Sequence, residues 1–512
     1  MSALVPLPVL LPLLAAAFSL AVGHFATVQR VLNLLVLSGI VVVAALLLAR
    51  ADGSGPVVLQ LGGYAPPFGI TLVADRLSAL LLLVSISVML AVLVFAIGQR
   101  ITDQGRASTS TAFHPMYLVL SAGVSLAYLT GDLFNLFVAF EVMLSASYVL
   151  IARRTNAERV RPSMTYVIVS LTSSLLFLTM VAVVYTATGT VNLADLAGRI
   201  ALLPDGARAG LALLMAVVFG IKSAVVPLHF WLPDSYPTAP APVTAVFAAL
   251  LTKVAVYALI RTQTLLFGDA TSGTFLLVVA LLTMLVGALG AIAQNDLNRL
   301  LSFLLVSHIG YMVFGLGLFT EIGLSGVILY VVHHIAVQGA LFLVGGLVIR
   351  HAGTPSLRHM RGLARSYPLV AVLFAIPALN LAGIPPFSGF VAKVVLLRAG
   401  AEAATPLAYV VTAAAVATSF LTLFALSKVW VGSFWGEPAP AVPDVDPTDD
   451  VTVGTGESSR PMLAATGGLV LAGLVFAALA GPLSGVSERA AHDLLDQGPY
   501  RAAVLGEARA AP

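Results

Sequence analysis

Cysteine is absent from the 512 residues of this chain, and charged residues are scarce, at 10% of the total. Without cysteine the chain can form no disulfide, no thiolate-bound metal site and no cysteine-ligated iron–sulfur cluster. Any redox chemistry would therefore belong to a partner, and we expect no cofactor in this chain. The net charge of +3 is small, and the bases are scattered rather than gathered with aromatic residues on one face, so nothing indicates binding to nucleic acid.

Apolar residues are abundant instead: 59% of the chain is hydrophobic and the mean hydropathy is +1.01. Such values lie outside the range of soluble domains and predict an all-α polytopic membrane protein in a lipid bilayer. The first apolar segment has no basic residue before it, unlike a cleavable signal peptide, so we interpret it as a retained span. Runs long enough to cross a bilayer predict about fourteen transmembrane helices, near residues 4–23, 29–49, 77–98, 115–130, 132–151, 163–187, 209–229, 240–262, 273–293, 299–319, 324–349, 367–397, 405–431 and 461–481.

The loops between these spans are short, and none is long enough to fold as a soluble catalytic domain. Cytoplasmic loops are enriched in Lys and Arg. With the N-terminus outside, the inner loops hold fourteen bases and the outer loops six, Arg261 among the latter, so both termini are predicted outside. The longest loop, about Gly436 to Arg460, is acidic and Pro-rich. We interpret it as a solvated linker, with cation collection or partner docking as the alternative.

Glu141 is the first charge inside a predicted span. It lies about nine residues, or ~14 Å, into a hydrocarbon layer ~30 Å thick, where a carboxylate costs a few kcal/mol. Lys222 is its expected partner, because pairing across helices reduces the penalty for both charges. A purely structural ion pair is the alternative, but apolar residues would pack there at lower cost.

Three of the four lysines, Lys222, Lys253 and Lys393, fall inside predicted spans. Arginine would stay charged, whereas a desolvated lysine can release its proton, so the choice of residue suggests protonation chemistry. Helix-breaking prolines follow or precede two of these lysines, at Pro227 and at Pro385 and Pro386. Two Gly/Pro-interrupted helices in separate halves of a membrane protein indicate paired repeats with functional sites at the breaks.

Histidines add further titratable groups. His333 and His334 are adjacent and cannot both face one partner, so we expect one of them to be a satisfied interior histidine. His308 and His229 are possible accessory residues. The pair has no third ligand at a suitable spacing, so no metal site is expected. Asp75, Asp132 and Asp234 lie at span ends and are expected to cap helices or lie at the membrane interface. The ordered series of Glu141, the lysines and the histidines predicts proton conduction along a hydrated chain.

Four stretches carry a family resemblance: GDLFNLFVAFEVMLSASYVL, KSAVVPLHFWLPDSYPTAPAPVTA, DLNRLLSFLLVSHIGYM and LAGIPPFSGFVAK. They resemble the antiporter-like membrane subunits shared by respiratory complex I and the Mrp-type multisubunit cation/proton antiporters. The resemblance implies fourteen helices with two inverted five-helix repeats, each with a broken helix. It also implies that Glu141 and Lys222 form the first charged pair, Lys253 the relay and Lys393 the terminal lysine. The regions expected are N-terminal helices (1–112), the two repeats (113–265 and 266–431) and an acidic loop, last helix and tail (432–512).

Within this family the chain is most similar to the Mrp D subunits, because complex I relatives usually have tryptophan just before the glutamate, where this chain has Phe140. One departure concerns Gln338, which replaces a lysine common in the family. Glutamine can hydrogen-bond a water but cannot carry a proton. The relay would then pass through His334 or water.

The resemblance therefore implies a transporter subunit rather than an enzyme: a proton-translocating subunit of an Mrp-type Na+/H+ antiporter in the bacterial inner membrane. Its expected partners are a larger antiporter-like A subunit, small membrane subunits, protons and Na+. Whether Na+ passes through this chain stays open. The alternatives are a proton-pumping subunit of a complex I-like or membrane hydrogenase assembly, and a structural scaffold, which leaves the buried lysines unexplained.

Overall fold

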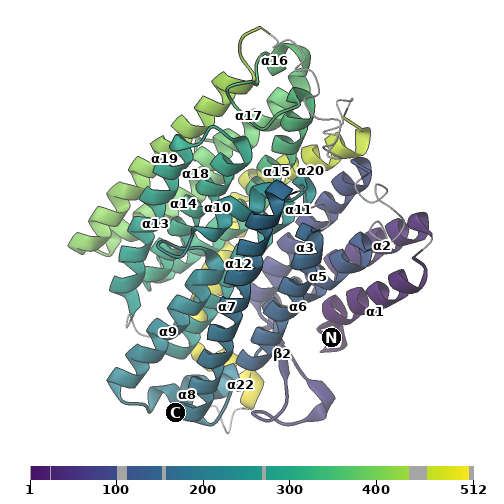
Figure 1. The fold of residues 1–512 in the computed structure, drawn as a ribbon. Coiled ribbons are helices and arrows are strands. Elements are labelled where there is room, and N and C mark those ends of the chain that lie inside the picture. The colour runs from purple at the N-terminus through teal and green to yellow at the C-terminus, as the bar shows by residue number, and fades with distance from the viewer. Residues whose placement is uncertain are drawn as a thin grey trace.

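The computed structural model describes residues 2–23, 25–100, 112–152, 157–267, 272–437 and 458–506. These residues form a bundle of long helices that run side by side, with short helices and one small β-hairpin at the end where the C-terminus lies (Figure 1). The predicted acidic linker falls mostly outside the described residues.

The first half of the chain contains the N-terminal helices and the first broken helix. The element bounds are η1 (Ser2–Leu4), α1 (Leu7–Ala21), α2 (Ala26–Ser54), β1 (Val57–Gln60), η2 (Leu61–Gly63), β2 (Thr71–Ala74), α3 (Arg76–Gly98), α5 (Phe113–Leu129), α6 (Leu133–Ala152), α7 (Ala157–Thr188), α8 (Leu193–Ala201), α9 (Asp205–Ser223), α10 (Trp231–Ser235) and η3 (Tyr236–Thr238). The strands β1 and β2 pair antiparallel, with Val57 opposite Ala74.

The second half begins with one nearly continuous helix that contains two π-helical turns, η4 and η5. The bounds are α11 (Ala241–Val246), η4 (Phe247–Leu251), α12 (Thr252–Thr262), η5 (Gln263–Phe267), α13 (Gly273–Ala293), α14 (Leu297–Gly317), α15 (Glu321–Ala352), α16 (Leu363–Ser366), α17 (Pro368–Ala382), α18 (Ser388–Glu402), α19 (Pro406–Ser433), α20 (Arg460–Ala478), α21 (Ala480–Leu495) and α22 (Gln497–Leu505).

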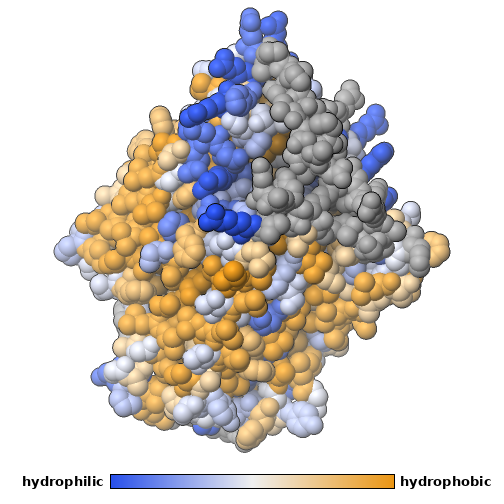
Figure 2. Space-filling view, in the orientation of Figure 1, coloured by the Kyte–Doolittle hydropathy of each residue, from blue (hydrophilic) through white to orange (hydrophobic). Residues whose placement is uncertain are grey.

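Twelve helices in the described residues are long and apolar enough to cross a membrane, and Phe113–Leu129 and Pro368–Ala382 are shorter apolar helices. Each of the fourteen predicted segments coincides with one of these helices, and the segment 367–397 is divided into α17 and α18. Hydrophobic side chains cover the middle of the visible face, whereas hydrophilic ones gather at the end near α16 (Figure 2). The predicted all-helical polytopic fold is confirmed.

The centre of the bundle is formed by three helical segments that are almost entirely buried: the helix from Ala241 to Phe267, α14 and α15. Lys253, His308, His333 and His334 lie on these segments, and all four side chains are buried. Polar residues in a membrane protein are expected on interior helices rather than toward lipid. The fold therefore concentrates the titratable groups of its second half in one interior region.

Two helices begin in the same way, in separate halves of the chain. The carboxylate of Asp132 accepts a hydrogen bond from the Asn135 N–H at 2.7 Å before α6, and that of Asp296 accepts one from the Arg299 N–H at 2.8 Å before α14. Each aspartate also forms an isolated β-bridge to a residue beyond the next long helix, Asn192 and Ser356 respectively. Repeated units would produce this correspondence. Their inverted relation and the four regional boundaries stay predictions.

The sequence analysis placed a tail after the last membrane span. The described part of that segment instead forms two helices, α21 and α22. Arg489 on α21 pairs with Asp52 of α2 at 2.7 Å, and the Gln60 side chain of β1 donates to the Val504 carbonyl of α22 at 3.3 Å. The helices α21 and α22 are only modestly amphipathic, and they are too short and too polar to be recognised in the sequence as membrane spans. Tertiary contacts therefore hold this segment against the bundle.

Arg261, predicted in an outer loop, lies instead in the buried helix α12. Its guanidinium forms an ion pair with Asp75 at 2.5 Å, with both side chains less than a tenth exposed. The guanidinium carbon lies 5.5 Å and 5.2 Å from the ring centres of Tyr257 and Tyr500, which adds cation–π attraction. Burial raises the pKa of the Tyr500 phenol, so Tyr500 stays neutral and packs α22 against the ion pair. Asp75 also caps α3, accepting from the Ser78 N–H.

Replacing Arg261 with methionine should destabilise the protein strongly, because the Asp75 carboxylate would remain buried without a counter-charge. Breaking a buried ion pair in this way costs about 3–5 kcal/mol. Thermal unfolding of the detergent-purified complex measures the effect. Arg398→Ala is the matched control, since Arg398 pairs with Glu402 on the exposed surface of α18 and should leave unfolding unchanged. An equal melting temperature for both variants would contradict a stabilising role for the buried pair.

Candidate functional site

Lys222 lies in the last turn of α9, directly before the helix ends at Ser223. Ala224 adopts a left-handed conformation with φ of 61°, and Pro227 lies in the irregular segment between α9 and α10. Irregular backbone at membrane depth is tolerated where it is surrounded by protein or lines a cavity. The break therefore places a buried lysine side chain beside backbone that no longer belongs to a helix.

Glu141 and Lys222 do not form the direct ion pair that the sequence predicted. Ser174 of α7 lies between them: its hydroxyl donates to Glu141 Oε1 and accepts from Lys222 Nζ at 3.3 Å. Lys222 and Ser174 are buried, whereas Glu141 is partly exposed. The sequence analysis missed Ser174 because serines in an apolar helix commonly bond to their own backbone. The cluster of Ser170, Ser173 and Ser174 in α7 was the available signal.

Aromatic rings surround the Lys222 ammonium. Lys222 Nζ lies 5.1 Å from the ring centre of Phe140 and 5.9 Å from that of Phe177. Such rings stabilise a cation through their π faces without accepting a proton. Phe140, which the sequence analysis noted only as a family difference, therefore contributes directly to the surroundings of the lysine.

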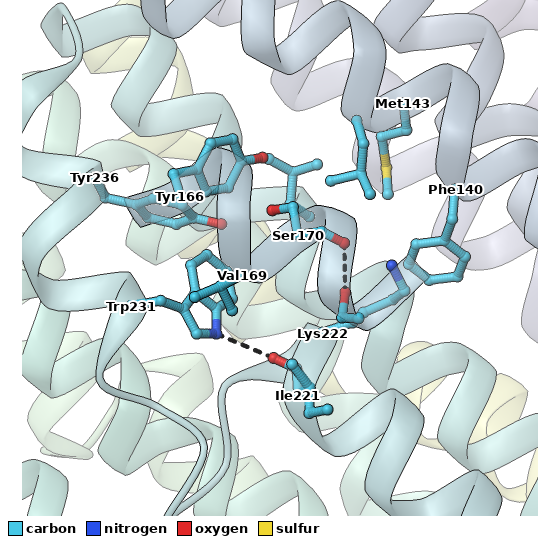
Figure 3. A pocket seen from close by; sticks show the side chains of 12 residues that line it. Phe140, Met143, Tyr166, Val169, Ser170, Ile221, Lys222, Trp231 and Tyr236 are labelled. Carbon is cyan, nitrogen blue, oxygen red and sulfur yellow. Dashed lines mark hydrogen bonds between the residues drawn. The ribbon is translucent and has the colours of Figure 1, made fainter. Parts of the chain in front are cut away.

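A cavity of about 30 Å³ adjoins this lysine. Figure 3 shows Tyr166, Trp231 and Tyr236 gathered on one side of it and Phe140 and Met143 on the other, with the Lys222 nitrogen near the Phe140 ring. Trp231 Nε1 donates to the Ile221 carbonyl at 3.1 Å, as the dashed line shows. The volume is enough for a water molecule, and the lining supplies serine and tyrosine hydroxyls.

Lys253 follows the π-helical turn η4. Its Nζ donates to the Ala248 carbonyl, five residues earlier, at 2.5 Å, and the side chain is completely buried. A π-helical turn changes the local hydrogen-bonding pattern and frequently occurs at functional sites. The buried hydroxyls of Tyr236 and Thr252 have no protein hydrogen-bond partner within the described residues. Tyr236 also lines the Lys222 cavity, together with Leu251, the last residue of η4.

The histidines form a cluster with tyrosines inside α14 and α15. His308 Nδ1 is hydrogen-bonded to the Tyr330 hydroxyl, and the His308 and His334 ring centres are 5.3 Å apart. His333 Nδ1 contacts Ser388 Oγ at 3.0 Å, whereas neither ring nitrogen of His334 has a protein partner among the described residues. His333 is thus partly satisfied, as expected for one member of the pair. The Gln338 amide donates to the Leu301 carbonyl at 3.1 Å.

Lys393 lies at the second helix break. Its Nζ donates to the carbonyls of Leu381 and Ala382, at 3.1 and 2.9 Å, which end α17, and it lies 4.9 Å from the Tyr311 ring centre. The C-terminal carbonyls of a helix attract a cation. Pro385 and Pro386 occupy the segment between α17 and α18.

The three buried lysines share one feature. Each is held by neutral oxygens, and among the described residues none of the three forms an ion pair with a carboxylate.

Two other residues that the sequence analysis named lie away from these lysines. His229 is in the segment before α10 with its ring 6.4 Å from Phe303, and Asp234 pairs with Arg299 at 2.7 Å.

This helical arrangement matches known proteins. The family model described as "NADH:quinone oxidoreductase/Mrp antiporter, TM" matches residues 130–422, which contain Glu141, all three lysines and the histidine cluster. The chain belongs to this family. It is 42% identical over 440 residues to the D subunit of the Na+/H+ antiporter of Alkalihalophilus pseudofirmus, covering 85% of this chain and 88% of that protein.

Two solved structures have the same fold. A chain of the Mrp complex from Dietzia sp. DQ12-45-1b is 36% identical with a TM-score of 0.91, covering 99% of this chain and 100% of that chain. A chain of respiratory complex I from Thermus thermophilus is 26% identical with a TM-score of 0.79, covering 96% and 99%. The recognition made from the sequence is therefore confirmed, and the family is one of transporter subunits. The roles of the individual site residues stay predictions.

Gly383→Ala should impair transport more than its backbone strain explains. Gly383 has φ of +87°, and an added Cβ would lie 2.7 Å from Lys393 Cδ, so the lysine would be displaced from its carbonyls. Gly353→Ala is the matched control, because Gly353 has φ of +72° but open space around it. Both changes carry about 1–2 kcal/mol of left-handed strain.

Both variants should therefore melt at similarly lowered temperatures, while Na+-dependent proton movement in everted membrane vesicles should fall several-fold only in Gly383→Ala. Equal transport in the two variants would show that the position of the Lys393 side chain is unimportant.

Proposed function

We propose that this chain is the proton-translocating subunit of a multisubunit Na+/H+ antiporter, moving protons through Glu141, Lys222, Lys253, His333 or His334, Lys393 and intervening water. The observation that carries this proposal is the set of three buried lysines held only by neutral oxygens. Such a lysine can exist as ammonium or amine without leaving a buried carboxylate unpaired.

A structural role accounts poorly for these lysines. A buried charge is expensive at membrane depth, and residues retained for packing alone would be apolar. Two of the three lysines also adjoin helix breaks, where carbonyls are free to accept from an ammonium or from water. The arrangement favours groups that change protonation state.

The order of groups supports a continuous path with water between its members. The Lys222 cavity leads to Tyr236 and Leu251, beside the turn that holds Lys253. The His308 ring centre lies 5.3 Å from that of His334 and 5.6 Å from that of Tyr311. Tyr311 stacks on Tyr330 at 5.2 Å between ring centres and lies beneath Lys393.

Gln338 cannot itself be a member of this proton path. Its amide nitrogen is committed to the Leu301 carbonyl, and an amide cannot carry a proton. His334 is four residues earlier on α15, on the same helical face, and its two ring nitrogens are buried without protein partners among the described residues. We therefore assign the central relay to His334 and water.

The proposal extends to location and partners. Exposed Arg358, Arg361 and Arg365 lie at the end near α16, which is typical of the cytoplasmic side. The N-terminal turn η1 and α22 both contact β1 at the opposite end, which supports both termini outside. The names of the relatives, a D subunit and an Mrp complex, support assembly with other subunits. We propose that these are a larger antiporter-like A subunit and small subunits in a bacterial inner membrane.

A second candidate is a proton-pumping subunit of a redox complex, favoured by the fold similarity to complex I. Gentle purification from the native membrane, followed by mass spectrometry, separates the two. Small membrane proteins with a larger antiporter-like relative would support the antiporter. Flavin or iron–sulfur partners would instead indicate that redox energy drives the same lysines.

Glu141→Ala should abolish Na+-dependent proton movement in everted vesicles, because Lys222 would lose the carboxylate that its protonation depends on. The complex should still assemble, as judged by co-purification of its subunits. Glu402→Ala, a change at an exposed glutamate on α18, is the control and should transport normally. Near-normal transport by assembled Glu141→Ala would refute the proposed path.

A further inference from the structure

The Ser174 hydroxyl on α7 differs from most of the serine and threonine hydroxyls of this helix whose bonds are known. Five other hydroxyls on this helix donate to backbone carbonyls of the same helix, those of Thr165, Ser173, Thr179, Thr186 and Thr188. Such bonding is the usual way to satisfy a hydroxyl within an apolar helix. The Ser174 hydroxyl instead donates to the Glu141 carboxylate on α6. Its hydrogen is therefore directed between helices, toward a charged acceptor.

The same hydroxyl oxygen accepts from Lys222 on α9 at 3.3 Å. A serine hydroxyl has one donor hydrogen and two acceptor lone pairs, so both bonds can exist together. On its other sides the ammonium is flanked by the rings of Phe140 and Phe177, which offer no lone pair. Within the described residues, Ser174 Oγ is the hydrogen-bond acceptor available to Lys222. Three helices thus meet through one side-chain oxygen.

We propose that the Ser174 hydroxyl transfers the proton exchanged between Lys222 and Glu141, so that the two groups communicate through this serine and not by direct contact. The inference rests on the proposed function, since it assumes that both groups change protonation state during transport. It assigns a role to a residue that composition and spacing did not single out.

The transfer balances without any further reactant. A Nζ–H bond of Lys222 breaks as a new Oγ–H bond forms on Ser174, and the original Oγ–H bond breaks as an O–H bond forms on Glu141 Oε1. The serine ends as it began, the ammonium becomes an amine and the carboxylate becomes a carboxylic acid. The reverse sequence resets the pair.

The surroundings favour such a relay in two ways. The charged forms of Lys222 and Glu141 and their neutral forms are closer in free energy here than they would be in bulk water, because partial desolvation disfavours both charges. Neither side chain has to move, since the hydroxyl already contacts both groups.

Three variants of the full complex test this inference in everted vesicles: S174A, S174T and T179A. S174A removes the hydroxyl, and we expect Na+-dependent proton movement to fall by about a hundredfold or more, as is typical when a positioned proton-transfer group is lost. S174T keeps a hydroxyl and should restore transport to within about twofold of the native rate. T179A is the matched control, because the exposed Thr179 hydroxyl on the same helix bonds to the Leu175 carbonyl and does not line the Lys222 cavity, and it should transport normally.

Two further measurements distinguish a defect in proton transfer from a general loss of activity: the Na+ dependence of the rate and the effect of D2O on it. In S174A the maximal rate should fall while the Na+ concentration for half-maximal rate stays unchanged, and the ratio of rates in H2O and D2O should differ from the native value. Co-purification of the other subunits establishes assembly for each variant. Native rates in assembled S174A would overturn the inference, as would a loss in assembled S174T as large as that in S174A.

The proposed function fails under a different result. Should assembled Glu141→Ala transport normally, the whole path is wrong, and Ser174 has no proton to transfer. If Glu141→Ala is inactive and S174A is normal, only the serine relay is wrong, and water must connect the two groups.

Discussion

The desolvation of lysine ammonium groups in a membrane interior is the constraint on which the rest of this structure depends. An unbroken helix offers no free carbonyl in its middle, because each is already used in the helical hydrogen-bond pattern. The chain supplies oxygens by interrupting its helices. The end of α17 gives two carbonyls to Lys393, and the π-helical turn η4 gives one to Lys253. The interruptions of the helices therefore supply the oxygens that two of the buried lysines require.

The two halves of the chain meet this constraint differently. In the first half Lys222 ends a helix but bonds to a serine, with a carboxylate one hydrogen bond further away. In the second half Lys393 has helix-end carbonyls and an aromatic ring, and no carboxylate pairs with it in the described residues. Near Lys222 the neighbouring charge can change, because Glu141 can gain or lose a proton. Near Lys393 the neighbouring charge is the fixed partial charge of the carbonyls that end α17. The surroundings of the two lysines therefore differ, although both lysines lie at breaks in helices.

Close packing of the backbone lets these groups meet. Gly389 on α18 lies so close to the Asn380 carbonyl and the His333 ring that an added Cβ would be within 3 Å of both. Its N–H donates to Asn380 Oδ1 at 2.9 Å, and the neighbouring Ser388 contacts His333. The segment around the second helix break therefore packs tightly against His333 on α15. A movement of one would displace the other, because closely packed atoms leave no free space.

The order of amino acids alone was enough to predict the class of protein, the approximate positions of the apolar helices and the family, and to single out Glu141, three lysines and the histidines within those helices. These features are local: a run of apolar residues, a proline or a lysine can be recognised without knowing its neighbours in space. The folded arrangement was needed to show that Ser174 separates Glu141 from Lys222, that Arg261 is buried against Asp75, and that the C-terminal residues fold back as α21 and α22. Each of these depends on which side chains of distant helices face one another, and the spacing of residues along one helix does not specify that contact.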